Sequence, residues 1–190
     1  MLGALLGCVL PAERVLVIED APELVIEHPH VVRLVTRTPN IEGAGGVAAR
    51  DLVRQALRMR PDRLVVGEFR GAEFIELVVA LNTGHEGGAA TLHANTAADV
   101  PARLVALGAL GGLSVDAVTT LVGSAVDVIL HLSRGGSGQR AVAEVGLVTV
   151  AGSGLTVLPV WSRRDGVMSA AQRLATTLEA RGAAVPAILR

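Results

Sequence analysis

Carboxylates follow two apolar runs of this sequence at the point where each run ends. The run 15–18 is followed by Glu19 and Asp20, and the run 64–66 is followed, after one glycine, by Glu68. Ligands of open α/β sheets bind outside the carboxyl ends of the strands. Carboxylates placed there can orient a water molecule or hold a hydrated Mg²⁺ ion. The same residues can also be helix N-caps or acids of surface turns, and the sequence leaves both interpretations open.

Two histidines surround a third short apolar segment. His85 precedes this segment and His93 follows it. A histidine at the end of a strand can contact a phosphate oxygen, although a single histidine in a loop is more often a polar side chain that its neighbours satisfy. His28 and His30 flank a proline, lack a nearby cysteine and are not spaced like zinc ligands, so no metal centre of that kind is indicated.

Every basic residue of the chain is an arginine. The sequence has 17 residues in the lysine and arginine class, none of them lysine, and eight of them lie between positions 33 and 70. Arg50, Arg54 and Arg58 are four residues apart, so a helix places them in one stripe. Planar guanidinium groups bind phosphate in a bidentate way, which favours an anion as the partner, whereas a solvated helix face is the simpler alternative. The same stretch also contains Arg33, Arg37, Arg60, Arg63 and Arg70.

Alternating strands and helices are expected to position these side chains. The two acid-ended runs have the continuous apolar pattern of strands that are buried on both faces. Between them, apolar residues recur at helical spacing from 49 to 57, and Pro61 ends that pattern. The elements expected next are a helix at 72–82, a strand at 89–93 and helices at 100–110 and 114–125. This alternation is typical of a parallel sheet with right-handed crossovers.

The last third of the chain has a different pattern. Strands are expected at 126–132, 141–151 and 155–161, separated by short glycine-rich turns. Such turns suit antiparallel hairpins, so we expect a β-meander here and a last helix at 169–181. The predicted fold class is therefore α/β, with a mostly parallel sheet flanked by helices, a C-terminal antiparallel β-meander and a terminal helix.

The composition argues against several classes of protein. A chain of 190 residues whose one cysteine is Cys8 has no disulfide framework. The net charge of -1 and the three aromatic residues argue against bulk electrostatic binding to nucleic acid or stacking on its bases. The apolar stretch 1–10 is about half as long as a membrane crossing and lacks the basic residues of a signal peptide, so a soluble protein is expected.

Three ordered motifs resemble those of the type II/type IV secretion ATPases. Residues 17–24, Val-Ile-Glu-Asp-Ala-Pro-Glu-Leu, resemble the aspartate box of that family. Residues 57–71 are similar to its Walker B region, and residues 83–95 are similar to its histidine box. Pro-Asn-Ile-Glu-Gly at 39–43 and Met-Arg-Pro-Asp at 59–62 are similar to the tight-adherence (Flp) pilus and conjugal-transfer branch in particular.

This resemblance extends to about residue 160 and implies a fold, an activity and partners. It implies that residues 1–162 are the C-terminal part of a RecA-like motor domain and that residues 163–190 are a helical tail. The family uses ATP and Mg²⁺ and works as a hexameric ring, cytoplasmic and peripheral at the inner face of the cytoplasmic membrane, to drive pilus assembly, secretion or conjugal transfer. Implied partners are further copies of the chain or complete ATPase subunits, together with inner-membrane platform proteins. No direct contact with nucleic acid is expected.

The resemblance also implies roles for the acidic residues. Glu19 is implied to be the base that polarises the attacking water, and Asp20 and Glu23 are implied to support it and the nucleotide. Glu68 is implied to act catalytically by holding Mg²⁺ through water.

Histidines and arginines complete the implied site. His85 and His93 are implied to sense the γ-phosphate, and Arg70 to contribute to nucleotide binding. The arginines implied to stabilise the transferred charge are Arg33, Arg37, Arg54 and Arg58. The first two follow the first acid-ended strand, in a segment that we expect to be a loop able to reach a neighbouring subunit. The other two lie on the helix at 49–57 or at its end, and we expect them to act within their own subunit.

One departure from the family pattern concerns phosphate binding. The Walker A loop of the family, Gly-x-x-x-x-Gly-Lys-Ser/Thr, needs a lysine, which this sequence lacks. That loop supplies a backbone cradle and a lysine to the phosphates and a hydroxyl to Mg²⁺. We therefore expect a truncated C-terminal portion of a motor, inactive alone, that arises from a misplaced gene start, a split gene or a deliberate fragment. The alternative is a genuine short chain, a non-catalytic ring subunit or pseudo-ATPase that joins complete subunits.

Overall fold

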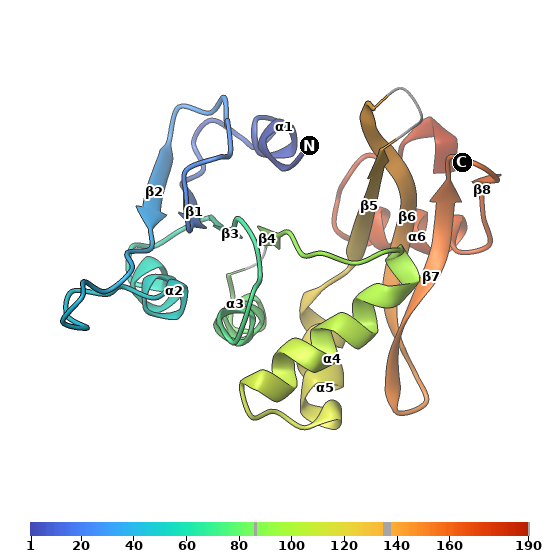
Figure 1. Ribbon diagram of the computed structural model, residues 1–190. Helices are drawn as coiled ribbons and strands as arrows, with labels where there is room; N and C mark the ends of the chain where they lie inside the picture. The colour runs from blue at the N-terminus through green and yellow to red at the C-terminus, as the bar shows by residue number, and fades with distance from the viewer. Residues whose placement is uncertain (86, 135–137, 190) are drawn as a thin grey trace. The chain divides into compact units, whose positions relative to one another are not determined.

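The computed structural model describes residues 1–85, 87–134 and 138–189 (Figure 1). The chain forms two compact units, one made of Met1–His93 and Leu107–Leu113 and the other of Ala94–Ala106 and Ser114–Arg190. The first unit contains a parallel sheet and the second contains an antiparallel sheet. The predicted α/β class, with a parallel sheet followed by a meander, is confirmed.

The parallel sheet of the first unit has the strand order β2-β1-β3-β4. Its strands are β1 Val15–Glu19, β2 Val31–Val35, β3 Arg63–Val66 and β4 Ala89–Ala90. β1 lies between β2 and β3, with Val17 opposite Arg33 on one side and Val65 on the other. All five residues of β1 are buried, as its continuous apolar run predicts for an interior strand.

The edge strand β2 corrects an expectation about the segment after β1. We expected a loop there that carries Arg33 toward a neighbouring subunit, whereas residues 31–35 pair with β1 along their whole length. The sequence pattern hides β2 because a charged residue interrupts a short apolar run. That charge is compensated by a residue of another strand, since Arg33 forms an ion pair with Glu19 of β1.

The strand β4 is shorter than the expected strand at 89–93. Only Ala89 and Ala90 pair with β3. Beyond them, Thr91 is held by the turn that follows β3, because its hydroxyl donates to the carbonyl of Gly67 and its own carbonyl accepts the N–H of Phe69 at 2.8 Å. His93 therefore lies in irregular chain beyond the strand.

Three helices accompany this sheet: α1 Leu2–Leu6, α2 Ala49–Leu57 and α3 Glu73–Leu81. α2 has the bounds that the apolar spacing predicts, and its Val53 and Ala56 are fully buried. α2 contacts both α3 and β1. α1 contributes to a separate buried cluster that contains Leu6, Val15, Val17 and Val65.

The second unit is built on an antiparallel meander of strand order β5-β6-β7-β8. The strands are β5 Val128–Arg134, β6 Arg140–Ala151, β7 Gly154–Ser162 and β8 Gly166–Val167. The three long strands confirm the predicted meander, and β8 is a short strand that the sequence analysis missed. The helical segments of this half of the chain are η1 Ala97–Asp99, α4 Val100–Leu110, α5 Val115–Ala125, α6 Ala171–Ala180 and η2 Ala187–Leu189. Within the described ranges, no helix has the length and apolar character that crossing a membrane requires.

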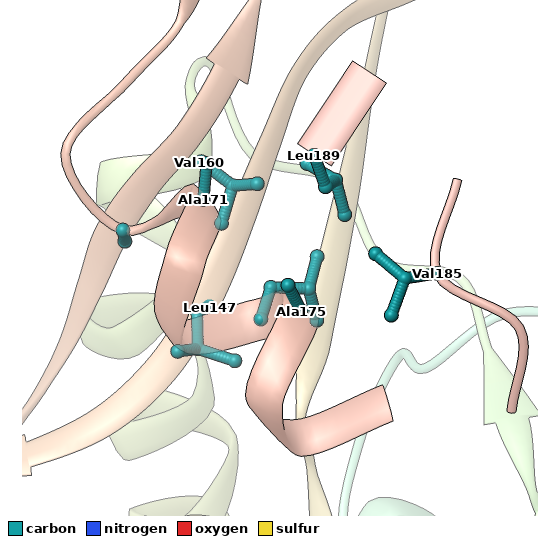
Figure 2. Close-up of a cluster of buried hydrophobic side chains, with 8 residues drawn as sticks. Leu147, Val160, Ala171, Ala175, Val185 and Leu189 are labelled. Carbon is teal, nitrogen blue, oxygen red and sulfur yellow. The ribbon is translucent and has the colours of Figure 1, made fainter. Parts of the chain in front are cut away.

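The helix α6 closes the core of the second unit. It confirms the helix expected at 169–181 and packs against β7 and η2. Figure 2 shows the resulting cluster of buried side chains, which includes Leu147, Val160, Ala171, Ala175, Val185 and Leu189. Residues 163–190 thus lie in the same unit as the meander, and the division of domains at residue 162 stays a prediction.

A close backbone contact at α1 generates a stability prediction. A Cβ atom on Gly3 would lie 2.0 Å from the carbonyl oxygen of Val25, whereas one on Gly7 would lie 3.4 Å from its nearest neighbours. We expect Gly3→Ala to lower the free energy of unfolding by about 1–3 kcal/mol, because the added methyl group forces the backbone apart. Gly7→Ala is the matched control and should change it little. Urea unfolding followed by circular dichroism measures both, and equal midpoints would contradict this packing.

Candidate active site at the edge of the parallel sheet

Polar side chains lie at the carboxyl ends of all four parallel strands. β1 ends in Glu19 and is followed by Asp20, and β3 is followed by Gly67 and Glu68. Thr36 comes directly after β2, and His93 comes three residues after β4. Because the strands are parallel, these ends share one edge of the sheet.

The carboxylate of Glu19 is buried at this edge and fully engaged. Its side chain is 4% exposed. Oε1 accepts the backbone N–H groups of Glu23 at 3.0 Å and Leu24 at 2.9 Å, and Oε2 accepts Nη1 of Arg33 at 2.8 Å. Gly67 lies against the same side chain, since a Cβ atom there would be 3.0 Å from Glu19 Cγ. The role of Glu19 as the base stays a prediction.

Arg33 and Arg37 both bind within their own chain. Nη2 of Arg33 donates to the carbonyl of Leu24 at 2.6 Å, in addition to the bond from Nη1 to Glu19. Arg37 follows β2, and its Nε donates to the carbonyl of Gly45. The reach of Arg37 to a neighbouring subunit stays a prediction.

Glu68 is partly exposed and forms a cluster with an arginine and a histidine. Its side chain is 26% exposed. Oε2 accepts Nη2 of Arg70 at 2.8 Å and Nε of Arg70 at 3.1 Å. Oε1 lies 2.9 Å from Nε2 of His93, whose side chain is 87% exposed. The structure therefore brings together three of the residues that the sequence singled out.

Arg70 connects this cluster to the end of β1. Its Nη1 lies 3.4 Å from Oδ2 of Asp20, and Oδ1 of Asp20 accepts the hydroxyl of Thr36 at 2.9 Å. The hydrogen bonds that Arg70 donates to Glu68, and then the negative charges of Glu68 and Asp20, raise the pKa of the Arg70 guanidinium above its ordinary value. We call Thr36, Asp20, Arg70, Glu68 and His93 the edge network.

The arginines of α2 lie outside the edge network. Nη2 of Arg54 donates to Oε1 of Glu76 on α3 at 2.9 Å, and Arg50 donates to the same oxygen. These ion pairs connect α2 to α3. Arg58 is the C-cap of α2. The catalytic roles of Arg54 and Arg58 stay predictions.

His85 also lies apart from the edge network, whereas the negative charge of Glu23 acts on Arg70 and helps to raise its pKa. The N–H of His85 donates to the carbonyl of Ala80 at the end of α3, and its Nδ1 is buried without a hydrogen-bond partner among the described residues. Glu23 takes part in the site through its backbone N–H, which binds Glu19. The sequence analysis assigned a role to the side chain of Glu23, and that role stays a prediction.

Sequence reasoning missed Thr36 and Glu73. Val35 pairs with Glu19 in the sheet, so Thr36 follows β2 as Asp20 follows β1, and a correct assignment of β2 is the signal that could have found it. Oε1 of Glu73 accepts the N–H groups of Arg70 at 2.6 Å and Gly71 at 2.7 Å, which fixes the turn that carries Arg70. The signal for Glu73 was an acid in the first turn of a helix, where it binds free N–H groups.

The edge network fits a cation that is bound through water. Its two carboxylates outnumber its one guanidinium, and Mg²⁺ keeps several of its waters in protein sites. No group of three or more His, Cys, Asp or Glu side chains able to hold a metal directly occurs among residues 1–85, 87–134 and 138–189. The network also lacks the lysine of a phosphate cradle, because the sequence has none.

An apolar groove of roughly 470 Å³ lies in the second unit and is a weaker candidate. Its lining includes residues of α4, α5 and the start of β7, among them Ala102, Val105, Thr119 and Leu155. None of the residues singled out from the sequence lines this groove. The candidate site is therefore the edge of the parallel sheet where the carboxyl ends of its strands lie.

The chain is similar in structure to a secretion ATPase and to a pilus motor. A solved structure of the VirB11 ATPase from the Brucella suis type IV secretion system, in complex with sulphate, is 28% identical with a TM-score of 0.64, over 76% of this chain and 44% of that one. The pilus retraction motor PilT with bound ADP is 25% identical with a TM-score of 0.53, over 73% of this chain and 40% of that one. These likenesses confirm the RecA-like fold of secretion ATPases. Residues 1–153 match the family described as type II/IV secretion system protein, and the chain belongs to this family.

A relative from Mycobacterium tuberculosis (strain H37Rv) resembles nearly the whole chain. Its name assigns it to conjugal transfer, and it is 50% identical over 184 residues, which are 97% of this chain and 52% of the relative. The chain thus spans about half the length of this curated relative. The motifs predicted a secretion ATPase of the conjugal-transfer kind, and the comparisons support that assignment at the level of the family.

The different burial of Glu19 and Glu68 generates a prediction about stability. We expect Glu19→Gln to lower the free energy of unfolding by about 2–4 kcal/mol, because it removes the charged partner of Arg33 at a buried position. Glu68→Gln should lower it by less than about 1 kcal/mol, because its ion pairs are solvated. Urea unfolding of the two variants beside the parent chain measures the contrast. Equal losses would mean that the burial of Glu19 is not what stabilises this edge.

Proposed function

We propose that this chain is the C-terminal part of an ATP-hydrolysing motor that serves a type II/IV secretion, conjugal-transfer or Flp pilus system. The observation that carries the proposal is the edge network, in which the ends of β1, β3 and β4 bring two partly exposed carboxylates, a guanidinium and a histidine to one edge. Membership of the family, and the likeness to solved ATPases, support this proposal.

Within this proposal the edge network forms the Mg²⁺ and γ-phosphate side of a nucleotide site. Mg-ATP, when bound, supplies the phosphoanhydride that is hydrolysed. Glu68, at the end of the Walker B region, holds hydrated Mg²⁺ through water, and His93 lies beside it to contact an anion. Arg70 offsets part of the charge of Asp20 and Glu68, which lowers the repulsion between the two carboxylates.

The phosphate cradle must come from residues outside this sequence. The 190 residues contain no lysine, and the M. tuberculosis relative is about twice as long as the matched region. We propose that the complete motor is a hexamer, peripheral at the inner face of the cytoplasmic membrane, that acts with inner-membrane platform proteins. Direct contact with nucleic acid is not part of this proposal.

A non-catalytic ring subunit is the second candidate function. Two observations favour it: the lack of lysine, and the engagement of both Glu19 oxygens by the protein. In this version the chain joins complete subunits and hydrolyses nothing. The genomic DNA upstream of the Met1 codon distinguishes the candidates, because an in-frame Gly-Lys-Thr run favours the motor and a stop codon close upstream favours the short subunit.

We expect the 190-residue chain alone to bind Mg-ATP weakly, because contacts that the Walker A loop makes with the phosphates and Mg²⁺ are missing. Isothermal titration calorimetry measures this directly. The expected result is no heat of binding at micromolar concentrations. A micromolar dissociation constant would contradict the proposal that the cradle lies outside the sequence.

A longer polypeptide tests the catalytic roles. The chain is joined to the part of the M. tuberculosis relative that it does not cover, and ATP turnover is measured. We expect Glu68→Gln and Glu19→Gln each to reduce turnover by roughly 10²-fold or more, because one acts on the metal and the other on the attacking water. Glu179→Gln on α6 is the matched control and should leave turnover unchanged. Near-normal turnover in Glu68→Gln would overturn the assignment of the edge.

A further inference from the structure

A closed ring of hydrogen bonds connects β1, the segment after it and β2. Leu24 uses both of its backbone groups in this ring: its N–H donates to Oε1 of Glu19 at 2.9 Å, and its carbonyl accepts Nη2 of Arg33 at 2.6 Å. The ring closes through Nη1 of Arg33, which donates to Oε2 of Glu19 at 2.8 Å. Glu19 and Arg33 lie on neighbouring strands.

This ring fixes a segment that has no regular structure of its own. Residues 20–24 belong to no helix or strand. The segment is held at its start by β1 and at its end by the bonds from Glu23 and Leu24 to Glu19. Between these points lies Asp20, whose side chain is 50% exposed and contacts Thr36 and Arg70. The position of Asp20 in the edge network therefore depends on the bonds at Glu19.

We propose that Arg33 is a positioning residue that acts within its own subunit: it clamps Glu19 and Leu24 and thereby fixes the acidic segment that presents Asp20 at the edge. Each outer nitrogen of its guanidinium donates a hydrogen bond within the chain, which favours a role of Arg33 in its own subunit. Asp20, and not Glu19, is then the carboxylate at the end of β1 that faces solvent. The clamp does not depend on the proposed function. The use of Asp20 in a nucleotide site does rest on the proposed function.

The geometry of the clamp requires an arginine. A guanidinium presents its donors in a rigid planar fork, so one side chain can bind a carboxylate and a carbonyl at once. A lysine keeps the charge but has a single ammonium group on a flexible stem. Arg33→Lys should therefore restore the bond to Glu19 only in part, and it is the conservative variant for the test.

Hydrogen exchange of the 190-residue chain tests the clamp without nucleotide. We expect Arg33→Gln to speed exchange of the Glu23 and Leu24 amides by at least about 10-fold, with a smaller effect in Arg33→Lys. The amides of Val65 and Leu174 report the general loss of stability that follows when the pair with Glu19 is broken, and exchange at Glu23 and Leu24 should speed beyond the change at those two. Arg37→Gln is the matched control and should leave the Glu23 and Leu24 amides as they are. Unchanged exchange of these two amides in Arg33→Gln would overturn the clamp.

Mixing of variants in the longer polypeptide tests whether Arg33 acts within its own subunit. Arg33→Gln subunits are mixed with Glu68→Gln subunits at several ratios, and ATP turnover is measured. If Arg33 acts within its own subunit, mixing does not recover turnover, because every nucleotide site then lacks either Arg33 or Glu68. Recovered turnover would overturn the proposal and place Arg33 at the neighbour's site. If the parent polypeptide has no turnover, the proposed function fails, while the exchange experiment still decides the clamp.

Discussion

The burial of the Glu19 carboxylate is the constraint on which the edge of the parallel sheet depends. Moving an ionised carboxylate out of water costs several kcal/mol unless it is paired and hydrogen-bonded. Here the cost is offset by one guanidinium and two backbone N–H groups. These donors come from β2 and from the segment after β1, so the same contacts that solvate the charge also hold two parts of the chain in place.

The acidic side chains at this edge differ in burial, and the difference bears on what each one can bind. Glu19 is enclosed by the protein, whereas Glu68 and Asp20 face solvent and share Arg70. A charge inside the protein is held by fixed dipoles, which define its geometry. A charge at the surface remains available to a hydrated ion or a phosphate. Sequence position alone does not reveal this distinction, because Glu19 and Asp20 are neighbours in the chain.

Much of the fold follows from patterns that are local in sequence. The strands β1 and β3 are continuous apolar runs, α2 has helical spacing, and the meander has glycine-rich turns, so each was predicted close to its observed bounds. β2 was missed because Arg33 is tolerated only through a partner on another strand. Thr36 was missed with it. The connection of Arg54 to Glu76 also depends on the packing of two helices, which no pattern within either helix encodes.

The small residue between Val66 and Glu68 has a consequence for transferring this site to another scaffold. Gly67 leaves room for the side chain of Glu19, and a methyl group there would crowd its Cγ. A designer who grafted the two acids onto a different parallel sheet would therefore have to copy a third position that carries no functional group. The site therefore depends on the absence of a side chain at Gly67 as well as on the carboxylates of Glu19 and Glu68.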